Sequence, residues 1–175
     1  MMHARPDLAG SPGDAAQICP RTLRAALGLF ATGVAIMTTV TSERRIVGLT
    51  VNSFSSVSLD PPLVLWSLAK KSPSRPCFEE TGYFAVNVLT TEQAEISSRF
   101  ARPIEDKFCG VKWQPGIRGV PVLSGCIAHF ECRLRHSIDG GDHMIFIGEV
   151  ERFDSHCGEP LLFLASRYHR AIPLA

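Results

Sequence analysis

The chain has 175 residues, of which 45% are hydrophobic and 20% charged, and its formal net charge is +1. These values are typical of one globular domain and argue against a nucleic-acid-binding protein, which usually carries a clustered basic excess. No apolar run approaches the roughly 20 residues of a membrane-spanning helix, and the first residues lack the apolar stretch of a secretory signal.

The N-terminal stretch before Pro20 is rich in Gly, Pro, Ala and Asp. We therefore expect residues 1–19 to be a flexible leader and residues 20–175 to form a single domain. An apolar stripe with i, i+3, i+4, i+7 spacing predicts a first helix over residues 20–32; it consists of Leu23, Ala26, Leu27 and Phe30. Gly33 is expected at the exit of this helix, since positive φ costs glycine nothing.

Strand-like segments follow in close succession. Residues 34–41 and 46–52 are rich in Val, Ile and Thr around a polar turn, which predicts a hairpin. The Pro61-Pro62 pair should interrupt ladder pairing, and the apolar run 63–68 indicates a strand buried on both faces. A basic loop at 70–75 and a short helix ending at Gly82 come next.

The second half of the chain contains the clearest patterns. After a strand at 83–89, Thr90 and Gln93 fit a capping box, which predicts a helix over 91–101. We expect a loop at 102–125. Apolar and polar residues then alternate over 128–135, and a turn at 139–142 leads to a returning strand at 143–153. The last stretch, 160–170, is apolar and ends in SRYHR.

About seven short strands with few helices predict a mainly β fold, an antiparallel barrel with flanking helices. A parallel sheet would need crossover helices, and most gaps between the strands are too short for them. The six cysteines include no C-x-x-C pair and no zinc-like spacing. We therefore expect no metal site and buried free thiols, which favours a cytoplasmic location.

The dinucleotide, phosphate-loop, metalloprotease and serine-hydrolase motifs do not occur. Three segments remain as candidates for binding. Six of the nine residues at 50–58 carry a hydroxyl or amide, which suits a planar ligand or a simple polar turn. Residues 67–72 combine hydroxyls with two lysines, which suits phosphate or a solvated loop. In the third segment, Asp142 can orient His143, which then contacts a ligand or caps the hairpin.

Five ordered motifs in this chain resemble those of the short-chain flavin reductases, which serve separate 4-hydroxyphenylacetate, phenol and chlorophenol monooxygenases. They are G-L-T-x-N-S-F-x-S-V-S-L-x-P-P at 48–62, S-L-x-x-K-S at 67–72, F-x-V-N-V-L at 84–89, D-K-F at 106–108 and G-D-H at 141–143. The resemblance covers residues 23–170. It implies an FMN-binding split β-barrel that forms a homodimer, with each flavin near the subunit interface.

The resemblance also assigns roles to individual residues. Thr50, Val51, Asn52 and Ser53 correspond to the isoalloxazine ring site, and Ser56 to the ribityl or phosphate region. Ser67, Leu68, Ala69, Lys71 and Ser72 correspond to the phosphate loop. Phe100, Ala101, Arg102 and Lys107 would lie along the outer part of FAD, with Lys107 a candidate for stabilising reduced flavin. His143, Arg167, Tyr168 and His169 would face the nicotinamide.

The implied reaction is hydride transfer from NADH to FAD, with FMN and NADPH as alternatives, followed by release of reduced flavin to a partner aromatic-compound oxygenase. The two cofactors supply this chemistry, so the protein needs no acid–base dyad. Two other functions are compatible with the residues. One is a non-enzymatic flavin-binding or electron-relay barrel, and the other is a small-molecule-binding barrel unrelated to flavin.

Overall fold

The structure is a computed structural model that describes residues 18–174, so residues 1–17 of the predicted leader lie outside the described residues. The helices are α1 (Pro20–Leu27), α2 (Arg75–Thr81) and α3 (Ala94–Phe100), with two 3₁₀ turns, η1 (Thr91–Gln93) and η2 (Ile117–Gly119). The strands are β1 (Thr32–Gly33), β2 (Ala35–Val40), β3 (Ile46–Val51), β4 (Ser55–Leu59), β5 (Pro62–Ala69), β6 (Tyr83–Val88), β7 (Trp113–Pro115), β8 (Pro121–Leu123), β9 (Ala128–Gly140), β10 (His143–Ser155), β11 (Leu161–Leu164) and β12 (Arg167–Arg170).

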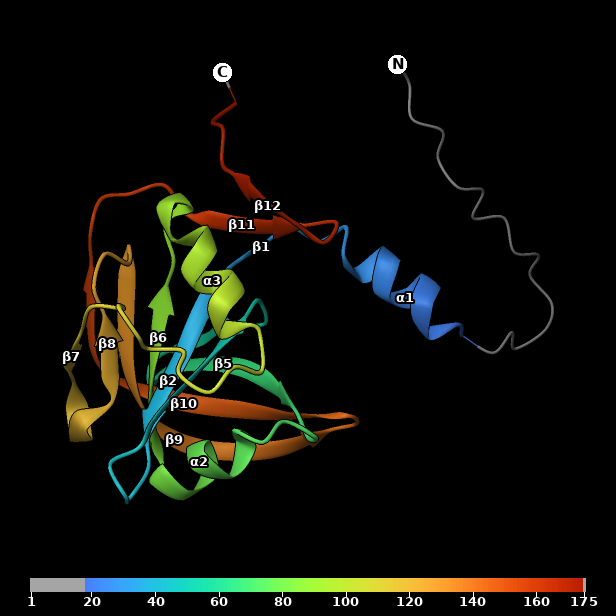
Figure 1. The fold of residues 1–175 in the computed structure, drawn as a ribbon. Helices are drawn as coiled ribbons and strands as arrows, with labels where there is room; N and C mark the ends of the chain where they lie inside the picture. Colours follow the sequence, from blue (N-terminus) through green and yellow to red (C-terminus); the bar gives the residue numbers. More distant parts are fainter. Residues whose placement is uncertain (1–17, 175) are drawn as a thin grey trace, which may run out of the picture.

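A seven-stranded antiparallel sheet forms the body, in the order β3-β2-β6-β9-β10-β5-β4 (Figure 1). The β2–β3 and β9–β10 hairpins pair as predicted, with Ala35 opposite Val51 and His143 opposite Gly140. The sheet curls, and Ser53, just after β3, bonds to Ser67 in β5 near the other edge. This confirms the mainly β, antiparallel split-barrel fold.

Aromatic side chains fill the interior of the curled sheet. Trp66 is fully buried and stacks on Phe146 with ring centroids 4.7 Å apart. The edges of Phe78 and Phe84 meet the same indole at 5.0 and 5.8 Å. A second apolar cluster lies under α3 around Phe100. Because both clusters pack against β2, this strand is buried at every position.

The capping box is confirmed, since the Thr90 N–H donates to Gln93 Oε1 at 3.1 Å and η1 runs into α3. The strand at 83–89 and the short helix ending at left-handed Gly82 are also confirmed. The predicted loop at 102–125, in contrast, contains the β7–β8 pair. A buried carboxylate holds this insertion, because Glu131 accepts the Ile117 N–H. No sequence period predicts such a contact.

Three predictions for the first half of the chain were wrong. Helix α1 ends at Leu27, because residues 32–33 pair with β11, and Gly33 lies in that strand pair. Strand β5 is buried on one face only, with Val64, Trp66 and Leu68 inward. The proline pair does not interrupt pairing, since Pro62 begins β5 opposite Leu59 of β4.

The thiol prediction is confirmed for three of the six cysteines. Cys77, Cys126 and Cys132 are buried and the other three are exposed, and all six are free. Burial raises the pKa of Cys126 to about 11, which makes its thiol a poor nucleophile at neutral pH. None of the helices within residues 18–174 combines the length and apolar character needed to cross a membrane.

Candidate functional site

The first two candidate segments share one hollow of about 270 Å³. It is lined by Leu49, Thr50, Val51, Asn52, Ser53, Ser67, Leu68, Ala69 and His143. Strand β3 ends on one side of the hollow, and β5 ends on the other. The third segment joins them because His143 pairs with Ala69 across the β10–β5 ladder. The tertiary structure therefore brings together three segments that are far apart in the sequence.

The hydroxyl of Ser53 fastens the two walls of this hollow. It accepts the Ser67 N–H at 2.9 Å and approaches the Ser67 carbonyl at 3.2 Å. The main-chain groups of Ser67 in β5 thereby find a hydrogen-bond partner just after the end of β3. The Ser53 side chain thus links the end of β3 to the backbone of β5.

A second hollow, of about 220 Å³, shares residues 50–52 with the first. Its lining adds Val34, Ala101, Phe163 and Tyr168 to Thr50, Val51 and Asn52. Residues 50–52 thus form a ledge common to the two hollows. This ledge has small or polar side chains, so a flat ligand could contact its backbone closely. His143 and Tyr168 line different hollows, and the ledge borders both of them.

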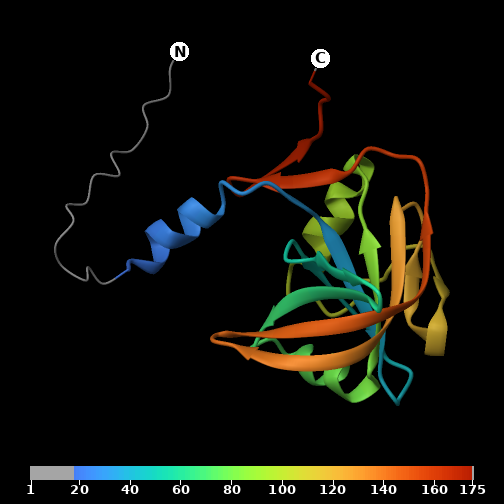
Figure 2. The same cartoon turned by 180° about the vertical axis from the view of Figure 1, so that it is seen from behind.

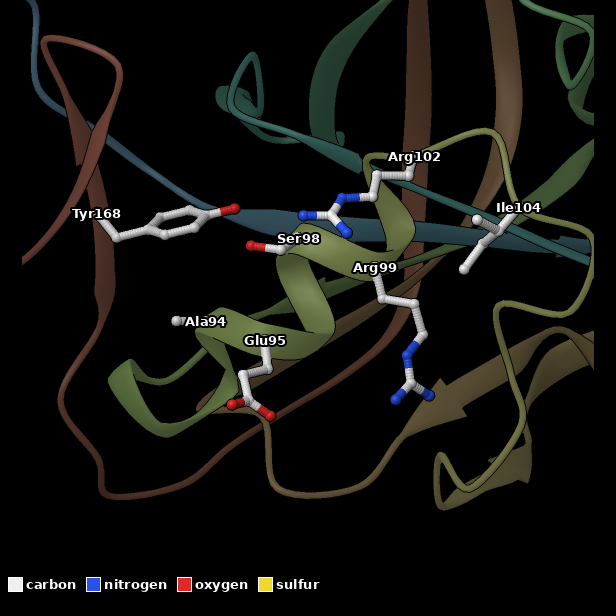
Figure 3. Close-up of a pocket in the computed structure, with 7 residues that line it drawn as sticks. All are labelled: Ala94, Glu95, Ser98, Arg99, Arg102, Ile104 and Tyr168. Atoms are coloured by element: carbon white, nitrogen blue, oxygen red, sulfur yellow. The ribbon is translucent and has the colours of Figure 1, made fainter.

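The outer face of α3 borders a third, larger hollow of about 490 Å³ (Figure 3). Its lining includes Ser98, Arg99, Arg102 and Tyr168. Arg99 is tethered, because its guanidinium donates to the Cys109 carbonyl at 2.6 Å. Figure 3 shows the Tyr168 hydroxyl pointing toward α3. Tyr168 also lines the hollow at residues 50–52, so it borders both hollows.

Charged side chains beside the first hollow, between β3 and β5, form a small network. We call this hollow the central hollow. His143 Nδ1 lies 2.6 Å from Asp142 Oδ1, as the sequence predicted, and this hydrogen bond lowers the pKa of Asp142. Lys70 forms an ion pair with Asp139 at 2.6 Å. Within the described residues, Lys71 has no ion pair, but its charge also lowers the pKa of Asp142.

Several predicted residues lie outside the central hollow. Ser56 is exposed on β4, and Arg167 and His169 are exposed on β12. Ser72 accepts the Ser74 N–H in the turn after β5. Their contacts to flavin or nicotinamide remain predictions from the resemblance.

Phe100 and Lys107 have structural contacts of their own. Phe100 is fully buried and packs edge-on against Phe108 at 4.9 Å. A Cβ on Gly48 would come within 2.6 Å of this ring, so glycine is needed there. Lys107 donates to the carbonyls of Gly48 and Phe100 at 3.2 and 2.9 Å, and burial lowers its pKa. These contacts tie β3 to the end of α3.

Other lining residues were missed by the sequence reasoning. Leu49, Val34 and Phe163 are apolar residues of strands or strand ends that also complete the hollows. Nothing in their local pattern distinguishes them from core residues. Ser98 and Arg99 lie on α3, whose exposed face carried no motif. They become recognisable only once α3 is placed against β12.

Comparison with known proteins adds independent findings. A family model described as a flavin reductase like domain matches residues 27–171. The chain is 48% identical over 150 residues to FMN reductase (NADH) SmoA of Agrobacterium fabrum, covering 86% of this chain and 85% of that protein. It is 42% identical over 156 residues to the flavin-dependent monooxygenase reductase subunit HsaB of Mycobacterium tuberculosis, covering 87% and 83%.

A solved structure shows the same fold. The Streptomyces globisporus NADH:FAD oxidoreductase SgcE6, in complex with NAD and FAD fragments, superposes with a TM-score of 0.84 at 37% identity. The match covers 91% of this chain and 98% of that one. The shared fold therefore extends over nearly all of both chains.

Proposed function

The chain belongs to the flavin reductase like domain family, and from that membership we propose that it transfers a hydride from NADH to FAD and releases the reduced flavin. It is an NAD(P)H:flavin oxidoreductase, with FMN as the alternative flavin. Its relatives are reductases or reductase subunits of monooxygenases. This supports an enzyme over a flavin-binding protein without activity.

The observation that carries the proposal is the hollow shared by residues 49–53 and 67–69. Its walls fit a flavin, because they offer backbone groups and short polar side chains to the rim of a flat ring. The free ammonium of Lys71, at the turn that follows β5, fits the phosphate end. Ser67, Leu68, Ala69 and Ser72 complete this phosphate side in the proposal.

When bound, flavin and NADH supply the hydride chemistry themselves. The protein's residues bind the rings and hold them at near-attack distance, roughly 3–3.5 Å. The ledge at residues 50–52 supports the flavin ring. His143, oriented by Asp142, positions the nicotinamide. Ala101 and Arg102 border the outer part of FAD, with Arg102 lining the hollow beside α3.

We treat flavin as a substrate that leaves after reduction. The two hollows that share the ledge are small compared with a whole dinucleotide, and much of the ligand would stay accessible. Micromolar affinity, about −8 kcal/mol, would allow turnover. The receiver is a separate oxygenase acting on an aromatic compound, and the reaction is placed in the cytoplasm. Residues 20–175 form the single catalytic domain in this proposal.

The test is NADH oxidation at 340 nm with and without added flavin. We expect rapid oxidation only when micromolar FAD or FMN is present. His143→Ala should raise the KM for NADH by about tenfold, since the loss of one oriented contact is worth about 1 kcal/mol or somewhat more. Flavin-independent oxidation, or none at all, would contradict the reaction. An unchanged KM in His143→Ala would contradict only the role of His143.

A homodimer is proposed from the exposed surface of α1. Figures 1 and 2 show this helix standing away from the sheet, and none of its residues is buried. Leu27 at its end is 65% exposed, and Phe30, just beyond the helix, is 77% exposed. A helix of eight residues is marginal in water by itself. A second copy of the chain would bury these apolar side chains.

Light scattering tests the homodimer. We expect a mass twice the 19.1 kDa of the chain. The double replacement Leu27→Asp and Phe30→Asp should shift the protein toward the monomer, because charges would enter an apolar contact. Arg24→Gln, on the same helix, is the control and should leave the mass unchanged. A monomeric wild type would refute the homodimer.

A further inference from the structure

Ser97 is a buried hydroxyl that connects the two sides of the candidate site. It lies in the middle of α3 with no exposed surface. Its Oγ is 2.8 Å from the hydroxyl oxygen of Tyr168 on β12. Its main-chain carbonyl accepts the Thr50 hydroxyl at 2.7 Å. One residue therefore bonds to the ledge through its backbone and to Tyr168 through its side chain.

Tyr168 is held by packing against the apolar cluster under α3 and, among the described residues, by one side-chain hydrogen bond. Strand β12 pairs only with β11, in a three-stranded sheet separate from the barrel. The Tyr168 ring meets Phe163 edge-on at 5.7 Å, but Phe163 belongs to the same hairpin. The bond to Ser97 is therefore the hydrogen bond that fixes the tip of this ring to the body of the protein.

The position of this ring determines the shape of the hollow beside the ledge. Tyr168 lines both that hollow and the larger one at α3. If its hydroxyl lost its partner, the ring could turn about χ1 and widen or fill the space against Thr50 and Asn52. A displacement of about 1 Å is enough to change a hydride-transfer rate strongly.

We infer that Ser97 is a positioning residue for hydride transfer, which acts by fixing the Tyr168 ring beside the ledge at residues 50–52. The inference rests on the proposed function and deepens it. Ser97 does not touch flavin or nicotinamide in this account. It orders the tyrosine ring, which together with His143 borders the nicotinamide in this proposal.

The two bonds of Ser97 can be separated by mutation. Ser97→Ala removes the hydroxyl but keeps the carbonyl that Thr50 uses. The ledge therefore stays anchored, and flavin affinity should be unchanged. Tyr168 loses its partner, so steps that involve nicotinamide should suffer. Tyr168→Phe removes the same hydrogen bond from the other end and should have the same effect.

The experiment measures flavin reduction by NADH in anaerobic stopped flow, with flavin affinity measured separately by fluorescence titration. We expect Ser97→Ala and Tyr168→Phe each to lower the reduction rate, at subsaturating NADH, by about tenfold. The double variant should be no slower than either single one, because both remove one shared interaction. The flavin Kd should stay within about twofold of wild type.

Thr39→Val is the matched control. Thr39 is also fully buried, and its hydroxyl donates to the Tyr83 carbonyl at 2.7 Å, at the other end of β2. Its replacement should destabilise the fold by a similar amount and leave the reduction rate unchanged. If Ser97→Ala matches Thr39→Val in rate, or if the two single effects add, the inference is refuted. If wild type shows no flavin-dependent oxidation, the proposed function fails instead.

Discussion

Replacement of Trp66 by alanine should lower the free energy of unfolding by about 3–5 kcal/mol, the usual cost of removing a buried aromatic side chain. Trp66 has no exposed surface and contacts three other aromatic rings, including Phe146 in parallel stacking. Alanine would leave a cavity inside the curled sheet, and the surrounding strands can collapse around it only in part. Urea unfolding followed by circular dichroism measures this loss.

The second tryptophan supplies the control. Trp113 is 37% exposed on β7, and its closest aromatic neighbour is Phe108 at 6.4 Å. Trp113→Ala should cost clearly less than Trp66→Ala, because more than a third of the Trp113 side chain is already exposed and its removal leaves no closed cavity. Equal losses in the two variants would contradict the placement of Trp66 at the centre of the core.

Trp66→Phe separates the contribution of aromatic packing to stability from the cost of the buried Trp66 N–H group. The Trp66 Nε1 group is buried and lacks a hydrogen-bond partner among the described residues. Phenylalanine keeps most of the aromatic contact and removes this unpaired donor, which offsets part of the lost volume. We therefore expect Trp66→Phe to cost much less than Trp66→Ala in the same unfolding measurement.

Replacement of Ser53 by alanine should weaken flavin binding by about tenfold or more. The part-buried Ser67 N–H would lose its acceptor, and the loss of a hydrogen bond of this kind costs about 1 kcal/mol or somewhat more. The two walls of the hollow, at the ends of β3 and β5, would no longer be linked by this hydrogen bond. Part of the flavin binding energy would then be spent on bringing the walls together. Each 1.4 kcal/mol spent in this way is a factor of ten in Kd. Fluorescence titration with FAD and FMN measures the change.

Ser55→Ala is the control for this prediction. Ser55 is exposed at the start of β4, and within residues 18–174 its hydroxyl bonds only to the neighbouring Ser56 carbonyl at 3.2 Å. It lies two residues from Ser53 but does not line the hollow. We expect an unchanged flavin Kd. If both serine variants bind flavin equally well, the hydroxyl of Ser53 does not hold the site together.

The sequence predicted those features that arise from local patterns. Period-two alternation over 128–135 and the glycine turn at 139–142 gave the β9–β10 hairpin. The pairing of Thr90 with Gln93 gave the start of the helical segment that ends in α3. The polar segments 50–58 and 67–72 were identified as binding candidates from residue type, and parts of both do line one hollow. Such signals involve neighbours in the chain, so sequence alone was sufficient.

Only the tertiary structure decided which distant residues meet. Phe100 was predicted beside the flavin but is buried, because β3 approaches α3 closely at Gly48. Ser97 carried no motif, yet it bonds to Tyr168, 71 residues away. Helix α1 showed an amphipathic stripe, but no part of the described chain covers it. The spacing of apolar residues along the sequence determines which face of a helix or strand is apolar. Which other residues contact that face is determined only when the sheet closes into the barrel.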